Sequence, residues 1–151
     1  MGSYSSLLNN YSLDIYLSFS EENEIISDLK TKLINLNYNI CDSYLIKKSL
    51  ETMNTLELSN HMNTLIENTK CIIVCLSLNS VKSYTQCIEM NKLLDNSSKF
   101  NNKVIYLIID NNYPSSLINI IQNNNNTYFP YYNVETFDDS FNKIIEFYNL
   151  L

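Results

Sequence analysis

The feature that most constrains the fold is a set of short apolar runs separated by helical patterns. Two of these runs, residues 71–76 and 104–109, are continuously apolar, rich in β-branched residues and bounded by polar residues. Runs of this length and composition are typical of strands that are buried on both faces of a parallel sheet. Residues 13–19, LDIYLSF, are predicted to form the first strand.

Two weaker strands and a series of amphipathic helices complete the pattern. We predict a short strand at 38–41, a tyrosine-rich edge strand at 128–134, and a long irregular loop at 44–55. Pro114 is expected to begin a short helix to 122, and Thr136 is expected to cap the last helix. The predicted apolar stripes of four helices are Ile25, Ile26, Leu29, Leu33 and Leu36; Leu58, Met62, Leu65 and Ile66; Tyr84, Cys87, Ile88, Asn91 and Leu94; and Phe137, Phe141, Ile144, Ile145 and Tyr148.

The alternation of strands and helices predicts the fold class. Buried strands that alternate with helices favour an α/β, flavodoxin-like three-layer sandwich. With right-handed crossovers, its five-stranded parallel sheet takes the order 2-1-3-4-5, with helices on both faces. Residues 1–12 are polar and are predicted to form a flexible leader before one domain at 13–151.

Charge and glycine content exclude several functions. The net charge is -6 and all ten basic residues are lysines, which argues against nucleic acid or an anionic membrane as a partner. The one glycine, Gly2, lies in a Met-Gly-Ser opening that is typical of a cloning remnant. Without internal glycine the chain has neither a dinucleotide fingerprint nor a Walker loop.

The four cysteines do not have the spacing of a metal site. Cys41, Cys71, Cys75 and Cys87 form no CxxC pair, and His61 is the only histidine, so no zinc or other metal is expected. Two of the four, Cys71 and Cys75, fall on one face of a predicted strand, where cysteine acts as a small hydrophobe. No signal peptide or long apolar segment is evident, so we expect a reducing, cytoplasmic location.

The stretch after the 71–76 strand carries the main functional candidate. A polar loop at 77–82 leads into a helix that contains Glu89. Ligands of open α/β sheets bind outside the carboxyl ends of the strands, so a carboxylate on this helix is a candidate functional group. The alternative is a solvated acid near a helix start, because the predicted stripe through Asn91 turns Glu89 away from the core.

Four segments of the chain, in order, resemble TIR (Toll/interleukin-1 receptor) domains. The first strand and its exit read LDIYLSFS at 13–20, and the third reads CIIVCLS at 71–77, followed by Ser83 and Glu89. The fourth strand reads VIYLIID at 104–110 and is followed by Tyr113 and Pro114, and the closing helix reads FDDSFNKIIEFYNLL. The resemblance covers about 13–150 and is greatest to the NAD-cleaving TIR domains of the animal axon-degeneration enzyme type.

The resemblance implies an activity and a set of site residues. It implies an NAD glycohydrolase that is activated by homotypic TIR–TIR self-association, with Glu89 as the catalytic residue. NAD is then the substrate, and no cofactor is expected. The residues implied to contact the substrate are Phe19, Ser20, Asp42, Tyr44, Lys47, Lys48, Ser83 and Tyr84. Here Ser20 and Glu21 replace the basic residues that the NAD-cleaving members carry after the first strand, and Tyr84 lies near the position of the family's tryptophan.

Other functions stay open at this point. Some TIR domains are scaffolds that only self-associate, so a non-enzymatic signalling adaptor is the main alternative. A third is a nucleoside-processing enzyme on a similar sheet, which would also use one carboxylate at a sugar C1. A phospho-receiver is disfavoured because residues 18–20 replace the acidic pair expected after its first strand.

Overall fold

A computed structural model describes residues 13–42, 54–95, 97–110, 115–123, 127–130 and 134–151. Its five strands form one sheet in the order β2-β1-β3-β4-β5, and every adjacent pair is parallel. The strands are β1 (Leu13–Ser18), β2 (Ile40–Asp42), β3 (Thr69–Leu76), β4 (Val104–Ile108) and β5 (Thr127–Pro130). The predicted fold class and strand order are therefore confirmed. The predicted leader at 1–12 and most of the predicted loop at 44–55 lie outside the described residues.

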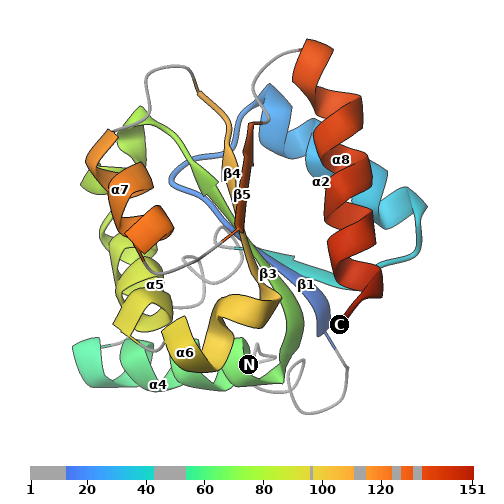
Figure 1. The fold of residues 1–151 in the computed structure, drawn as a ribbon. Helices are drawn as coiled ribbons and strands as arrows, with labels where there is room; N and C mark the ends of the chain where they lie inside the picture. Colours follow the sequence, from blue (N-terminus) through green and yellow to red (C-terminus); the bar gives the residue numbers. More distant parts are fainter. Residues whose placement is uncertain (1–12, 43–53, 96, 111–114, 124–126, 131–133) are drawn as a thin grey trace.

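Helices cover both faces of the sheet and make the three layers (Figure 1). One face is covered by α2 (Glu24–Asn35) and α8 (Val134–Asn149). The opposite face is covered by α4 (Thr55–Asn68), α5 (Tyr84–Asp95) and α7 (Ser115–Asn123). Shorter segments, η1 (Leu78–Lys82), α6 (Ser97–Phe100) and η2 (Asn101–Lys103), join these elements.

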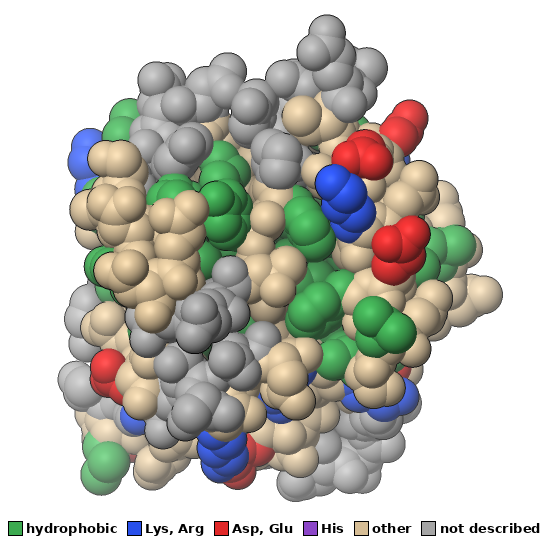
Figure 2. Space-filling view, in the orientation of Figure 1, with side chains coloured by type: hydrophobic (Ala, Val, Ile, Leu, Met, Phe, Trp, Pro, Cys, Tyr) green, Lys and Arg blue, Asp and Glu red, His purple; other side chains and the backbone are tan. Residues whose placement is uncertain are grey.

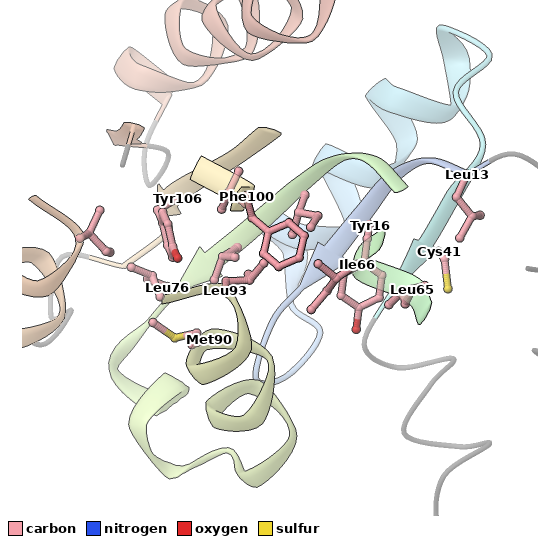
Figure 3. Close-up of a cluster of buried hydrophobic side chains, with 14 residues drawn as sticks. Leu13, Tyr16, Cys41, Leu65, Ile66, Leu76, Met90, Leu93, Phe100 and Tyr106 are labelled. Atoms are coloured by element: carbon pink, nitrogen blue, oxygen red, sulfur yellow. The ribbon is translucent and has the colours of Figure 1, made fainter. Parts of the chain in front are cut away.

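Side chains of the central strands alternate between two hydrophobic clusters. On β3, Cys71, Ile73 and Cys75 pack with α2 and α8, whereas Val74 and Leu76 pack with α4 and α5. The α4–α5 cluster also holds the ring of Tyr16 and the side chain of Met90 (Figure 3). The predictions that Cys71 and Cys75 share one face and that β3 is buried on both faces are thus confirmed.

The boundaries of several elements differ from prediction; β2, for example, is Ile40–Asp42 and not 38–41. The predicted loop at 77–82 contains the 3-10 helix η1, where Ser77 and Ser80 bond locally instead of leaving the chain extended. The last helix begins at Val134, so Thr136 lies inside its first turn and is not its cap. The edge strand β5 is described over Thr127–Pro130, and Val134 already belongs to α8, so the predicted end of this strand at 134 is wrong.

The predicted buried face of α5 is only partly right, since Leu94 packs against the α4–α5 cluster as predicted but Asn91 does not. Met90 and Leu93 are buried together with Gln86, whereas Asn91 is exposed. These three buried positions follow the spacing i, i+4, i+7 of one helix face, which a polar glutamine at its first position conceals in the sequence. The prediction that Glu89 points away from the core depended on a buried stripe through Asn91. That prediction therefore loses its basis.

The amino edge of the sheet is held together by polar side chains. Asp14 accepts hydrogen bonds from the Asn39 amide at 2.8 Å and from the Tyr148 hydroxyl at 3.2 Å. Lys103 donates from Nζ to the carbonyl of Thr69 at 2.9 Å and also to that of Ile66. These contacts tie β1 to α8, and the end of α4 to the start of β4.

Candidate functional site at the carboxyl edge of the sheet

The site lies where the chain leaves β1 and β3. The connection from β1 leads outward to β2, whereas the connection from β3 leads the opposite way to β4. The carboxyl ends of β1 and β3 therefore form the topological switch point, which is where open α/β sheets bind ligands. Ser20 follows β1, Ser77 follows β3 and Asp110 follows β4, so polar side chains from three adjacent strands lie at this edge.

Two hydroxyl groups meet at the switch point. The Oγ atoms of Ser20 and Ser77 lie 3.2 Å apart, and either atom can donate. Beside them, Asn79 Nδ2 donates to Glu21 Oε1 at 2.6 Å. Side-chain hydrogen bonds therefore join the loop after β1 to the start of the 3-10 helix after β3.

The 3-10 helix η1 forms one rim of the site. Its start is fixed by the Ser77 N–H, which donates to Ser80 Oγ at 2.9 Å, and by the Leu78 N–H, which lies 3.4 Å from Asp110 Oδ2. Leu78 and Val81 are 47% and 48% exposed, and their three-residue spacing places them on one side of a 3-10 helix. The rim thus presents two apolar side chains beside the serine hydroxyls.

Ser83 caps the helix that carries Glu89. Its Oγ accepts the Gln86 N–H at 3.2 Å, and its carbonyl accepts the Cys87 N–H at 2.9 Å. Its own N–H donates to the Ser80 carbonyl at 3.4 Å. The hydroxyl predicted to contact substrate is therefore engaged in starting α5. The Ser-x-x-Gln spacing at 83–86 is the signature of such a cap and was available in the sequence.

Gln86 is the polar group that the sequence prediction missed. It is 0% exposed, and its Nε2 donates to the carbonyl of Cys75 at 2.9 Å. Its Oε1 has no hydrogen-bond partner among the described residues. Buried side-chain acceptors are normally paired, so this atom requires an explanation.

An ion-pair network closes the end of β2. Lys30 Nζ lies 2.8 Å from Asp42 Oδ2 and 3.0 Å from Glu22 Oε1. Burial lowers the pKa of Lys30, but the hydrogen bonds and charges of Asp42 and Glu22 together outweigh it and raise the pKa above 10.5. The side chain of Asp42 is 5% exposed. This residue was predicted to contact substrate, but its carboxylate joins β2 to α2 through Lys30.

The structure brings together some of the other predicted site residues. Ser20 is half-buried at the switch point, whereas Phe19 is 3% exposed and packs in the α2–α8 cluster. Glu89 and Tyr84 belong to α5, but their side chains lie outside what the structure describes. Tyr44, Lys47 and Lys48 lie outside the described residues, so their substrate contacts stay predictions.

Other features of the described residues do not add to this site. No group of three or more metal-ligating side chains occurs among them, and none of their helices is long and apolar enough to cross a membrane.

An open hollow of about 480 Å³ lies between α2 and α8, lined by Lys32, Asn35, Leu36, Asp138, Phe141 and Asn142. Figure 2 shows acidic side chains beside a basic one over the α8 side of this face. On α8, Lys143 pairs with Asp139 at 3.1 Å.

Comparison with known proteins identifies a family. The family model described as "TIR domain" matches residues 15–145. Among solved structures, the chain is similar to the TIR domains in the structure of the activated Roq1 resistosome directly recognizing the pathogen effector XopQ. The TM-score is 0.52 at 18% sequence identity, and the match covers 91% of this chain and 80% of that chain. No curated protein matches the chain.

Proposed function

Because the chain belongs to the TIR-domain family, we propose that it is an NAD glycohydrolase that acts in signalling through TIR–TIR self-association. The observation that carries this proposal is the position of Glu89. It lies in α5, the helix that the chain enters from the carboxyl end of β3, at the topological switch point of the sheet. Ligands of open α/β sheets bind outside the carboxyl ends of the strands, so a carboxylate in this helix is a candidate to reach them.

The chemistry of NAD cleavage suits a single carboxylate. The bond between the nicotinamide nitrogen and ribose C1′ breaks, and its electron pair leaves with nicotinamide, which departs as a neutral base. The ribose then carries an oxocarbenium-like positive charge, which a nearby anion stabilises. Water adds to C1′ and loses a proton, so the products are nicotinamide, ADP-ribose and H⁺. Attack by the adenine ring in place of water gives the cyclic product.

Polar groups around the switch point offer contacts for the rest of the substrate. The paired hydroxyls of Ser20 and Ser77 suit the ribose hydroxyls, which both donate and accept. Lys82 is exposed at the end of η1, one residue before the cap of α5. Together with the predicted Lys47 and Lys48, it would offset the charge of the pyrophosphate.

The decisive test compares NAD consumption by the native chain with that of Glu89→Gln and Glu89→Ala. Products are separated chromatographically over a range of protein concentrations. Loss of the carboxylate should lower turnover at least ~100-fold, because it removes the charge that stabilises the transition state. Glu146→Gln, an exposed glutamate on α8, is the matched control. Cleavage that survives in both Glu89 variants would exclude the proposed mechanism.

Self-association makes a second, separable prediction. Activity per molecule should rise with protein concentration, because the assembled form is the active one. Sedimentation velocity at the same concentrations shows whether the rise follows the assembled fraction. Activity per molecule that stays constant while the chain assembles would contradict this part of the proposal.

One observation favours the second candidate, a non-enzymatic TIR adaptor. The carboxyl edge carries the acids Glu21 and Asp110, and Lys30 there is already paired with two carboxylates. This charge pattern suits an anionic dinucleotide poorly. The adaptor predicts self-association with no NAD turnover at any concentration, including those at which the chain is fully assembled.

A further inference from the structure

Gln86 occupies a buried position on α5 that an apolar side chain could fill equally well. It lies on the buried stripe of α5 with Met90 and Leu93, which are 5% and 3% exposed, while Gln86 itself is 0% exposed. An apolar side chain would fill the same volume without burying an amide oxygen that has no described partner. The glutamine must therefore be understood through the contacts that it makes.

The Gln86 side chain departs from the usual capping arrangement. In a Ser-x-x-Gln capping box, the glutamine reaches back to the N–H of the serine. Here that N–H, of Ser83, donates to the Ser80 carbonyl instead. Gln86 Nε2 is therefore free to reach into the core, where it donates to the Cys75 carbonyl near the end of β3 at 2.9 Å.

Two different attachments thus fix the first turn of α5. The Gln86 backbone N–H is held by Ser83 Oγ, and its side chain is held by the backbone of β3. The first attachment sets where the helix begins, and the second sets its distance and rotation relative to the strand. Glu89 lies one helical turn further on, so its placement depends on both.

We propose that Gln86 is a positioning residue that sets the placement of Glu89 against the switch point. The inference rests on the proposed NAD cleavage and names a residue on which that activity depends. Replacing Gln86 by an apolar residue removes the unpaired Oε1 but leaves the Cys75 carbonyl without this donor. One unpaired acceptor is exchanged for another, so the change in stability is small and the change in geometry dominates.

The first experiment is Gln86→Met, which keeps the length of the side chain and removes the amide. We expect kcat for NAD to fall about 10- to 100-fold, because small misplacement of a reacting group costs this much. KM should stay within about 2-fold, since the residue does not contact substrate. Gln122→Met is the control, because the chain's other glutamine is exposed on α7.

A second variant, Gln86→Glu, adds a measurement, the pH profile of activity. A purely structural role of Gln86 would not change this profile. A protonated carboxyl can donate to the Cys75 carbonyl as the amide does, whereas an ionised carboxylate cannot. Activity of this variant should therefore approach the native level at low pH and be lost as pH rises. The other titratable groups on the elements around residue 86 are Cys75 on β3, Tyr106 on β4, and Cys87 and Glu89 on α5. All of them are present in both proteins, so an added step in the pH profile of the variant belongs to residue 86.

The outcomes separate this inference from the proposed function. If the native chain cleaves NAD and Gln86→Met retains full kcat, Gln86 is not a positioning residue and the proposed function stands. If Gln86→Met loses kcat only in proportion to its folded fraction, measured by circular dichroism, its role is structural and the inference is overturned. If the fully assembled native chain cleaves no NAD, the proposed function fails and this assignment fails with it.

Discussion

At the amino edge of the sheet, Asp14 accepts hydrogen bonds from a backbone amide and a tyrosine hydroxyl, and Lys103 donates to two backbone carbonyls. At the carboxyl edge, two serine hydroxyls face one another, and a buried glutamine oxygen has no partner among the described residues. The same sheet therefore has one edge where charged groups are held by the backbone. At its other edge, neutral hydroxyls and a buried amide with unused hydrogen-bonding capacity lie beside the acids Glu21 and Asp110.

This difference follows from what each edge must do. Charged side chains that are paired with backbone groups fix one geometry, and they are costly to disturb. Neutral hydroxyls can exchange one partner for another when a ligand arrives. We therefore expect changes at the amino edge to alter stability and changes at the carboxyl edge to alter activity.

Alkaline pH should produce the largest effect, because it ionises thiols and phenols that the fold buries. Burial raises the pKa of Cys71 to about 12, and burial together with Asp14 raises that of Tyr148 to about 12. The native state keeps these protons at pH values where the unfolded chain has lost them. Stability is therefore fully present below pH 9 and falls through pH 12, by on the order of 4 kcal/mol for Cys71 alone.

Urea unfolding at pH 8, 9, 10 and 11 measures this loss. Hydrogen exchange at the same pH values should show α8 losing protection before α5, because Tyr148 lies on α8. Cys71→Val should reduce the dependence on pH without removing it, because burial also raises the pKa of Cys75 and of Tyr106. Constant stability from pH 8 to 11 would contradict the prediction, and earlier loss of protection in α5 would reverse the comparison between the edges.

Asp14→Ala should give the next largest effect. It leaves the Asn39 amide and the Tyr148 hydroxyl without their acceptor, which costs about 2–3 kcal/mol of unfolding free energy. Urea unfolding at pH 7 measures the change, and NAD cleavage per folded molecule should be unaltered. Asp139→Ala is the control, because Asp139 is 72% exposed in its ion pair with Lys143, and such pairs contribute less than about 0.5 kcal/mol.

Much of this architecture could be predicted from the sequence. The continuous apolar runs of β3 and β4 predicted a parallel sheet, because no other element of that length is apolar on both faces. Polar positions were harder to place. Thr69 and Lys70 lengthen β3 beyond its apolar run, and Gln86 takes a core position that a hydrophobic pattern cannot reveal. Asp42 lies in a buried ion pair with Lys30, a contact between distant segments that local spacing does not encode.

Lys103→Met should give a moderate effect, again at the amino edge. Burial lowers the pKa of Lys103, so its ammonium is partly desolvated and its bonds to the carbonyls of Ile66 and Thr69 matter more. Losing them should cost about 1–2 kcal/mol. Urea unfolding reports the cost, and Lys99→Met, at an exposed pair with Glu67, is the control. Equal effects of the two substitutions would remove Lys103 from the set of groups that hold this edge.

Ser20→Ala should have the smallest effect on stability and tests the other half of the comparison. The hydroxyl is half-buried and its partner, Ser77 Oγ, is itself a hydroxyl, so unfolding free energy should change by less than about 0.5 kcal/mol. If the pair receives the ribose, KM for NAD should rise about 3- to 10-fold, the equivalent of one hydrogen bond. Ser27→Ala, on the exposed face of α2, is the matched control.

The Ser20 result discriminates between two uses of the carboxyl edge. A higher KM with unchanged stability means that the spare hydrogen-bonding capacity serves a ligand. Lower stability with unchanged KM means that Ser20 and Ser77 serve to join two loops, just as Asp14 joins β1 to α8. Both edges of the sheet would then contribute to stability. In that case the contacts to NAD must come from other residues, with Lys82 on η1 as the next residue to test.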